Sequence, residues 1–336
     1  MEVNMTPFER LKFKMEGKEV DKIPNLNIAM ALVAKEAGTD YSTYAQDYRK
    51  LVDGNLFCVE KYGFDVVSAI SDPVREAAAF GSEIVFPENG VPYCAEPLLK
   101  DGYEIEKLKI VSPYDNERTL DRIKAIEEFR KRVGGEIPII GWVEGVLAEC
   151  ADLRGVSSLM MDLAEEEDLN EVMEIIFRQQ CRFIDAQVKA GADIIGVGNA
   201  VASLIGPSMY EEFAFRYDKA TIQYIHELGA KAKLHICGNI TPLLPQLKML
   251  EVDILDFDWM VDCQKIREIT EGSNICFCGN IDPVAVMLEG TASEVEAKTV
   301  KCIMEGGEQY IAACGCEVPA DTPRDNLIAM NKVLYR

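Results

Sequence analysis

Short apolar runs alternate with longer amphipathic or charged stretches from the first fifth of the chain to its end. Each run has the length of a strand and most of the stretches between runs could form a helix, an order typical of repeated β-α units. Because parallel strands need such crossover connections, the pattern predicts a parallel sheet covered by helices. Eight strands are predicted, at Ile23–Asn27, Asp65–Ile70, Ile137–Trp142, Asp193–Val197, Ala232–Ile236, Asp253–Phe257, Ile275–Cys278 and Gln309–Ala313.

Several stretches between the runs begin at or just after Ser, Thr or Pro, as helices commonly do. Eight alternating units predict an α/β fold, a (β/α)₈ TIM barrel that forms a single domain over residues 1–336. A doubly wound sheet is less favoured because no Gly-x-Gly-x-x-Gly or Walker-type loop follows a predicted strand. The predicted helices include Ser42–Tyr62, Leu120–Val133, Glu167–Ala190, Pro207–Leu228, Ala292–Gly306 and Pro323–Tyr335.

The segment from Ser71 to Val111 fits the repeat least well. It carries several prolines and glycines around one apolar piece, Glu83–Phe86. We expect a long β-α excursion over the mouth of the barrel.

The formal net charge of −22 is unfavourable for binding to nucleic acid or to anionic membranes. Sequence-independent binding to nucleic acid requires Lys and Arg to neutralise phosphates, and anionic membranes are disfavoured for the same reason. The first residues lack a basic region followed by an apolar run, and no stretch approaches the roughly 18 apolar residues of a membrane span. A cytoplasmic protein is therefore expected.

The chain has 11 cysteines, an odd number in a chain too large to need disulfide bonds for its stability. Reduced thiols are the better interpretation, and most of them are expected to be small buried apolar side chains. These are Cys58, Cys94, Cys150, Cys181, Cys263 and Cys302.

The pair His235 and Cys237 stands at the end of a predicted strand. Residues two apart on a strand point to the same side, so this spacing suits two ligands of one metal ion. If the strand belongs to a barrel, its carboxyl end is where active sites gather.

A second cysteine pair, Cys314 and Cys316, follows the last predicted strand and is expected to face the same side. One imidazole and two thiolates suit tetrahedral Zn²⁺, and three protein ligands with an open fourth position are typical of catalytic zinc. The alternative is a hydrogen-bonded core histidine, a buried thiol and a Cys-Gly-Cys turn.

Taken together, several short segments spread over nearly the whole chain resemble the uroporphyrinogen decarboxylase superfamily. Within it, the likeness is to the zinc-dependent, corrinoid-linked methyltransferases, typified by the methylcobamide:coenzyme M methyltransferases and including related O-demethylase methyltransferases. The segments are Gly17–Pro24, Glu144–Gly145, Gly191–Asp193, Val201–Ser203, His235–Asn239, Gly279–Pro283, Gly315–Cys316 and Thr322–Asn326.

This resemblance implies that zinc is held by His235, Cys237 and Cys316, with Cys314 a neighbour. It places Asp258 where an acidic residue of some relatives could cap the open coordination site, and a hydrogen-bonding role beside the ligands is an equal alternative. Glu144 matches an acidic-glycine pair of relatives and could orient the substrate or a zinc ligand. The alternative is a carboxylate that stabilises a helix N-terminus.

The resemblance further implies methyl transfer between a small molecule and cobalt. The chain has only two histidines, neither in an Asp-x-His-x-x-Gly cobalt-ligand motif, so the corrinoid is expected on a separate protein. The small molecule could be a thiol, a methyl ether or a methylamine, and the direction of transfer stays open. A corrinoid-independent zinc methyltransferase is one alternative. A metal-free porphyrinogen decarboxylase-like enzyme is another, disfavoured because the segment 23–30 lacks the arginines that clamp substrate carboxylates in that class.

Overall fold

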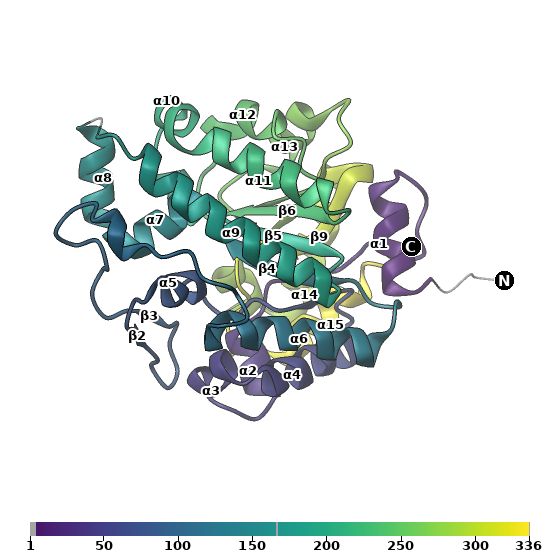
Figure 1. Ribbon diagram of the computed structural model, residues 1–336. Helices are drawn as coiled ribbons and strands as arrows, with labels where there is room; N and C mark the ends of the chain where they lie inside the picture. Colours follow the sequence, from purple (N-terminus) through teal and green to yellow (C-terminus); the bar gives the residue numbers. More distant parts are fainter. Residues whose placement is uncertain (1–4, 166, 336) are drawn as a thin grey trace.

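The computed structural model describes residues 5–165 and 167–335. Its main sheet has seven parallel strands, in the order β1-β4-β5-β6-β7-β8-β9, with helices packed around it (Figure 1). The predicted strands from Asp65 onward are thereby confirmed, within a few residues at their ends. The strands of this sheet are β1 (Val67–Ser68), β4 (Ile139–Glu144), β5 (Ile194–Gly198), β6 (Lys231–Ile236), β7 (Ile254–Phe257), β8 (Cys276–Ile281) and β9 (Tyr310–Cys314).

The first predicted strand, Ile23–Asn27, forms only a short bridge. The backbone N–H of Leu26 donates to Ala312 on β9, and that of Asp65, just before β1, donates to Asn25. The segment therefore lies between β9 and the start of β1 and closes the barrel. Pro24 has no N–H to donate, which limits the pairing to this bridge.

The helices lie where the sequence predicts them, with one clear difference. The predicted helix Ser42–Tyr62 is two helices, because Asp47 has an extended backbone (φ −124°) and its side chain caps the second of them. The helices are α1 (Pro7–Met15), α2 (Ala31–Glu36), α3 (Tyr41–Gln46), α4 (Tyr48–Tyr62), α5 (Arg75–Phe80), α6 (Glu117–Val133), α7 (Val146–Arg154), α8 (Val156–Ala164), α9 (Asn170–Ala190), α10 (Pro207–Met209), α11 (Phe215–Glu227), α12 (Leu244–Lys248), α13 (Cys263–Thr270), α14 (Ala292–Gly306) and α15 (Arg324–Lys332).

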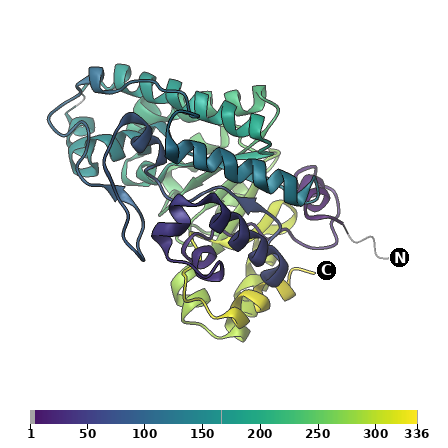
Figure 2. The same cartoon turned by 60° about the horizontal axis from the view of Figure 1, so that its bottom comes forward.

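The segment 71–111 contains α5 and a small antiparallel hairpin of β2 (Ile84–Val85) and β3 (Tyr93–Cys94). Its residue Arg75 reaches Glu144 at the carboxyl end of β4. The segment thus extends over the mouth of the barrel, as expected. Helix α1 lies at the opposite end of the barrel from the hairpin (Figures 1 and 2).

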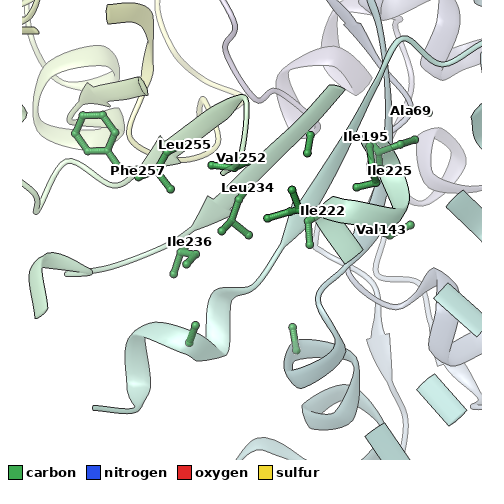
Figure 3. Close-up of a cluster of buried hydrophobic side chains, with 14 of the residues drawn as sticks. Ala69, Val143, Ile195, Ile222, Ile225, Leu234, Ile236, Val252, Leu255 and Phe257 are labelled. Atoms are coloured by element: carbon green, nitrogen blue, oxygen red, sulfur yellow. The ribbon is translucent and has the colours of Figure 1, made fainter. Parts of the chain in front are cut away.

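The barrel wall separates two apolar cores. The outer core fills the space between strands and helices, where Leu234 of β6 lies next to Ile222 of α11 (Figure 3). The inner core lies inside the barrel and includes Trp142. Side chains on each strand alternate between the two, which is the period of a β-strand.

The inside of the barrel also holds buried charge. Lys233 on β6 forms an ion pair with Asp256 on β7, and both side chains are 1% exposed. The ammonium group of Lys233 lies 5.6 Å from the centre of the Trp142 ring. The ring fits because β5 carries Gly196 opposite it, where an added Cβ would lie 2.1 Å from a ring carbon.

We therefore predict that Gly196→Ala destabilises the fold by about 2 kcal/mol, since a Cβ there must displace a ring packed inside the barrel. Urea denaturation measures this free energy of unfolding. Gly206→Ala is the matched control, because an added Cβ at Gly206 meets nothing within 4 Å. Equal stability of the two variants would contradict the packing described here.

Candidate functional site

The mouth of the barrel brings His235 and Cys237 together at the end of β6. The His235 side chain points into the barrel, on the same side as Lys233, and Cys237 follows the last residue of the strand. The imidazole Nε2 lies 3.1 Å from the sulfur of Cys237. The predicted pairing of these two side chains is therefore present in the structure.

Cys316 joins them from a segment 79 residues further along the chain. It follows Gly315, where a Cβ would lie 2.2 Å from the backbone nitrogen of Trp259. Glycine lets the chain after β9 pass close against the loop after β7 and turn Cys316 toward β6. The sulfur of Cys316 lies 3.7 Å from that of Cys237.

These three side chains have the chemistry and spacing of a metal site. Their ligand atoms lie within 4.8 Å of one another, and they form the one such group found among the described His, Cys, Asp and Glu residues. Two thiolates on one tetrahedral zinc ion lie about 3.8 Å apart, given Zn–S bonds of about 2.3 Å. The observed separation of the sulfurs fits that value, so the donor set suits zinc.

A buried carboxylate orients the histidine. Asp256 Oδ1 lies 3.3 Å from His235 Nδ1, which leaves Nε2 facing the two sulfurs. Burial lowers the pKa of His235, but the Asp256 carboxylate outweighs it and raises the pKa to about 9. Such a carboxylate behind a histidine fixes its ring orientation and is a usual companion of metal-bound imidazole.

The two thiols differ in acidity. A hydrogen bond from Cys237 is the largest cause that lowers the pKa of Cys316, to about 5, and His235 lowers it further. The same hydrogen bond and burial raise the pKa of Cys237 well above its usual range. The cluster thus stabilises negative charge on sulfur, which is the form that binds metal.

Asp258 lies beside the cluster, after the end of β7. Its carboxylate accepts hydrogen bonds from the backbone N–H groups of Gly238, at 2.9 Å, and Met260, at 3.1 Å. It therefore ties the turn after Cys237 to the loop after β7. A role as a cap of the metal site stays a prediction.

Glu144 lies at the end of β4. It is paired with Gly198 on β5, and Gly198 is paired with His235 on β6. Its carboxylate lies 3.2 Å from Arg75 and accepts a hydrogen bond from the Trp142 indole at 3.1 Å. Burial raises the pKa of Glu144 to about 8, although Arg75 opposes this change. Its ion pair with Arg75 is a contact that the sequence alone did not suggest.

Cys314 does not accompany Cys316. It packs in the outer core, whereas Cys316 reaches the cluster at the mouth of the barrel. The expectation that the two thiols face the same side is wrong, because the close passage at Gly315 redirects the chain between them.

Sequence reasoning missed Asp256, Lys233 and Arg75. A signal existed for the first two, because charged residues two apart from His235 and Asp258 interrupt apolar strands. A charged side chain at an inward position of a buried strand needs a partner of opposite charge. Here Lys233 and Asp256 are partners of each other. The approach of Arg75 from α5 had no such local signal.

A cavity of about 1170 Å³ lies elsewhere, at the end of the barrel covered by α1. It is lined by residues at the amino ends of strands, including Asp193 and Lys231. Active sites of TIM barrels lie at the carboxyl ends, where the His235 cluster stands. The cavity is therefore not the candidate site.

The fold and the site together define a TIM-barrel protein with a His/Cys cluster at its mouth. The chain matches the uroporphyrinogen decarboxylase (URO-D) family over residues 6–336, and it belongs to this family. The family resemblance expected from the sequence is confirmed.

Its relatives include methyltransferases, and the similarity extends over almost the full length of both proteins. Methylcobamide:CoM methyltransferase MtbA of Methanosarcina mazei is 27% identical over 334 residues, covering 97% of this chain and 96% of that protein. Methylcobamide:CoM methyltransferase MtaA of Methanosarcina barkeri is 27% identical over 339 residues, covering 96% and 95%. A solved structure described as a methyltransferase from Methanosarcina mazei superimposes with a TM-score of 0.88 at 22% identity, covering 98% of both chains.

These names support the predicted class of enzyme, a methyltransferase, and the solved structure confirms the fold. A uroporphyrinogen decarboxylase of Geobacter metallireducens is also similar, at 24% identity over 83% of this chain and 82% of that protein. No described helix is both long and apolar enough to cross a bilayer. The cytoplasmic location stays a prediction.

We predict that the purified wild-type protein contains about one zinc ion per chain and that Cys237→Ala loses it, because two ligands do not complete a catalytic zinc site. Elemental analysis of both proteins measures this. Cys181→Ala, which changes a thiol outside the cluster, should keep the metal. Wild-type protein free of zinc after growth in zinc-replete medium would contradict the site.

A second prediction concerns pH. The pKa of Cys316 is lowered to about 5, so its thiolate is present above that pH, whereas Cys237 stays a thiol. In metal-free protein at pH 6, iodoacetamide should therefore alkylate Cys316 before Cys237, as measured by peptide mass spectrometry. Reaction should slow as the pH falls toward 4. Equal labelling of both cysteines at pH 6 would contradict the assignment.

Proposed function

We propose that this protein moves a methyl group between a small molecule and the cobalt of a separate corrinoid protein, with zinc held by His235, Cys237 and Cys316. The observation that carries the proposal is the convergence of these three side chains, from two distant segments, at the carboxyl end of the barrel. The similarity to methylcobamide:CoM methyltransferases along the chain supports the same reaction class. Residues 1–336 would act as one barrel domain, of which residues 1–4, 166 and 336 lie outside the described part.

Zinc held by His235, Cys237 and Cys316 would lower the pKa of a thiol substrate bound to it and stabilise the thiolate. In the direction of thiol methylation, an S–C bond forms as the Co–C bond breaks. The electron pair of the Co–C bond stays on cobalt, and the thiol proton is released to solvent. In the reverse direction, a methylated heteroatom is the donor and reduced cobalt takes the methyl group.

The residues around the cluster hold it in shape for this reaction. Asp256 fixes the ring of His235, and Asp258 fixes the turn that carries Cys237. We infer that Glu144 orients the substrate, because its carboxylate stands at the same end of the barrel, two strands from His235. We infer that Asp258, which accepts a hydrogen bond from the backbone N–H of Gly238 beside Cys237, would cap the metal site when no substrate is bound.

The corrinoid has to come from a partner protein. One of the two histidines, His235, belongs to the cluster, and the other, His226, lies 2.7 Å from Asp253 at the amino ends of the strands. Neither histidine lies in an Asp-x-His-x-x-Gly cobalt-ligand motif. The partner would dock at the barrel mouth, because cobalt must approach within bonding distance of the methyl group or the thiolate.

We predict that the zinc-loaded protein methylates a small thiol with free methylcobalamin as donor, followed by loss of the methylcobalamin absorbance and by mass spectrometry of the thioether. Cys316→Ala should lower kcat/KM by more than about 100-fold, since it removes a ligand of the activating metal. Cys181→Ala should match the wild type. Methyl transfer from a donor other than a corrinoid, with none from methylcobalamin, would favour the corrinoid-independent alternative.

A further inference from the structure

Cys316 has the least regular backbone of the three residues at the metal site. His235 lies within β6, which has a parallel strand on each side, and Cys237 follows that strand directly. Cys316 lies two residues beyond the end of β9, in a segment that forms no further strand or helix before α15. A backbone outside a ladder or a helix keeps its shape through other contacts, so the position of the Cys316 sulfur depends on what holds this segment.

Two backbone hydrogen bonds hold the segment on either side of Cys316. The N–H of Gly315 donates to the carbonyl oxygen of Ile281 at 2.9 Å, and the N–H of Val318 donates to that of Ile28 at 2.8 Å. Between these two anchors, neither Cys316 nor the next residue, Glu317, forms a backbone-to-backbone hydrogen bond with any described residue. The short stretch that carries the thiol therefore needs a further contact to hold it.

The side chain of Glu317 makes that contact. Its Oε1 accepts hydrogen bonds from the backbone N–H groups of Met30, at 3.1 Å, and Ala31, at 2.7 Å. These residues begin α2, and Met30 has no side-chain oxygen with which to cap the helix. The carboxylate of Glu317 therefore satisfies the N–H groups of a helix that lies 286 residues away in the chain. The same contact ties the segment of Cys316 to the start of α2.

With this contact, each residue of the metal site has a carboxylate that holds it in place. Asp256 stands behind the ring of His235, and Asp258 holds the turn after Cys237. Like Asp258, Glu317 joins two segments of backbone, one of which carries a thiol. Removal of groups that orient metal ligands typically lowers metal affinity by about 10- to 100-fold, because the free ligands no longer wait in the bound geometry.

We propose that Glu317 is a positioning residue of the metal site, which holds the Cys316 sulfur within reach of the ion by joining its segment to the start of α2. This inference rests on the metal site of the proposed function and adds a residue to it. Glu317 acts without touching the ion, since the ligand atoms that lie within 4.8 Å of one another belong to His235, Cys237 and Cys316 alone among the described residues.

Three variants test this role through the dissociation constant for zinc, measured by competition with a chromophoric chelator. Glu317→Ala removes the acceptor and Glu317→Asp shortens the side chain by one methylene, so both should weaken zinc binding by about 30-fold. Glu317→Gln keeps an oxygen at the same reach and should weaken it by about threefold or less, because an amide oxygen also accepts from backbone N–H groups. If Glu317→Ala does not fold, the comparison of the Asp and Gln variants decides the result.

Asp282→Ala is the matched control. Asp282 also accepts hydrogen bonds from two backbone N–H groups, those of Val284 and Ala285, both at 2.9 Å. These groups belong to the helical turn Pro283–Leu288 that Asp282 itself caps, so the carboxylate joins no distant segment. Its loss should lower the free energy of unfolding of the metal-free protein and leave the zinc affinity at the wild-type value.

Protein in which Co²⁺ replaces zinc shows whether the weakening arises at Cys316. The absorbance of the cobalt–thiolate bonds, measured per bound ion, should fall in Glu317→Ala toward the lower value of Cys316→Ala, which keeps one of the two thiolates. Glu317→Gln should keep the wild-type absorbance. A loss of general stability, without displacement of Cys316, would leave this absorbance unchanged.

The outcomes separate the two proposals. Equal zinc affinity in all the Glu317 variants, or an unchanged cobalt–thiolate absorbance in Glu317→Ala, would overturn the positioning role and leave the proposed methyl transfer standing. Weaker metal binding in the Ala and Asp variants would support the role even if the wild-type protein methylated no thiol, a result that would count against the proposed function alone. A wild-type chain that binds no metal would overturn both.

Discussion

The buried carboxylate of Asp256 is the contact on which the site depends. It pairs with Lys233 and stands behind His235, so one group on β7 balances the charge of two side chains on β6. A charge taken out of water is tolerated only with a partner of good geometry, and removal of one partner typically costs several kcal/mol. The ion pair therefore fixes the register of these strands and the direction of the imidazole together. The Trp142 ring, beneath the Lys233 ammonium, and the small Gly196 complete the layer below the site.

Much of this arrangement could be predicted from the sequence, because the strands are short apolar runs that alternate with amphipathic helices, and local residues determine both. The His235 and Cys237 pair was predictable for the same reason, since two residues apart on a strand share a side. The first strand was expected to be longer than it is, as Pro24 cannot take part fully in a ladder. The helix 42–62 was expected to be continuous, but Asp47 interrupts it and caps its second half.

Contacts between segments that are far apart in the chain could not be predicted from local sequence patterns. The spacing of Cys314 and Cys316 predicted that both thiols face the same side, but the close approach of Gly315 to the loop after β7 separates them. Arg75 and Glu76 on α5 contact Glu144 on β4, about 70 residues later, so nothing near Glu76 or Arg75 predicted this neighbour. A buried glutamate without a hydrogen-bond partner, such as Glu149, is visible only when every surrounding atom is placed.

The long chain interval between Cys237 and Cys316 has a consequence for folding. One ion bound to both would cross-link residues 79 apart and enclose the strands β7, β8 and β9 within the loop. Closing a loop of that length in the unfolded chain removes conformational entropy, by an amount comparable to that of a long-range disulfide bond. The metal would then act as a cross-link for this part of the barrel, and the cell's zinc supply would set how long this part survives proteolysis.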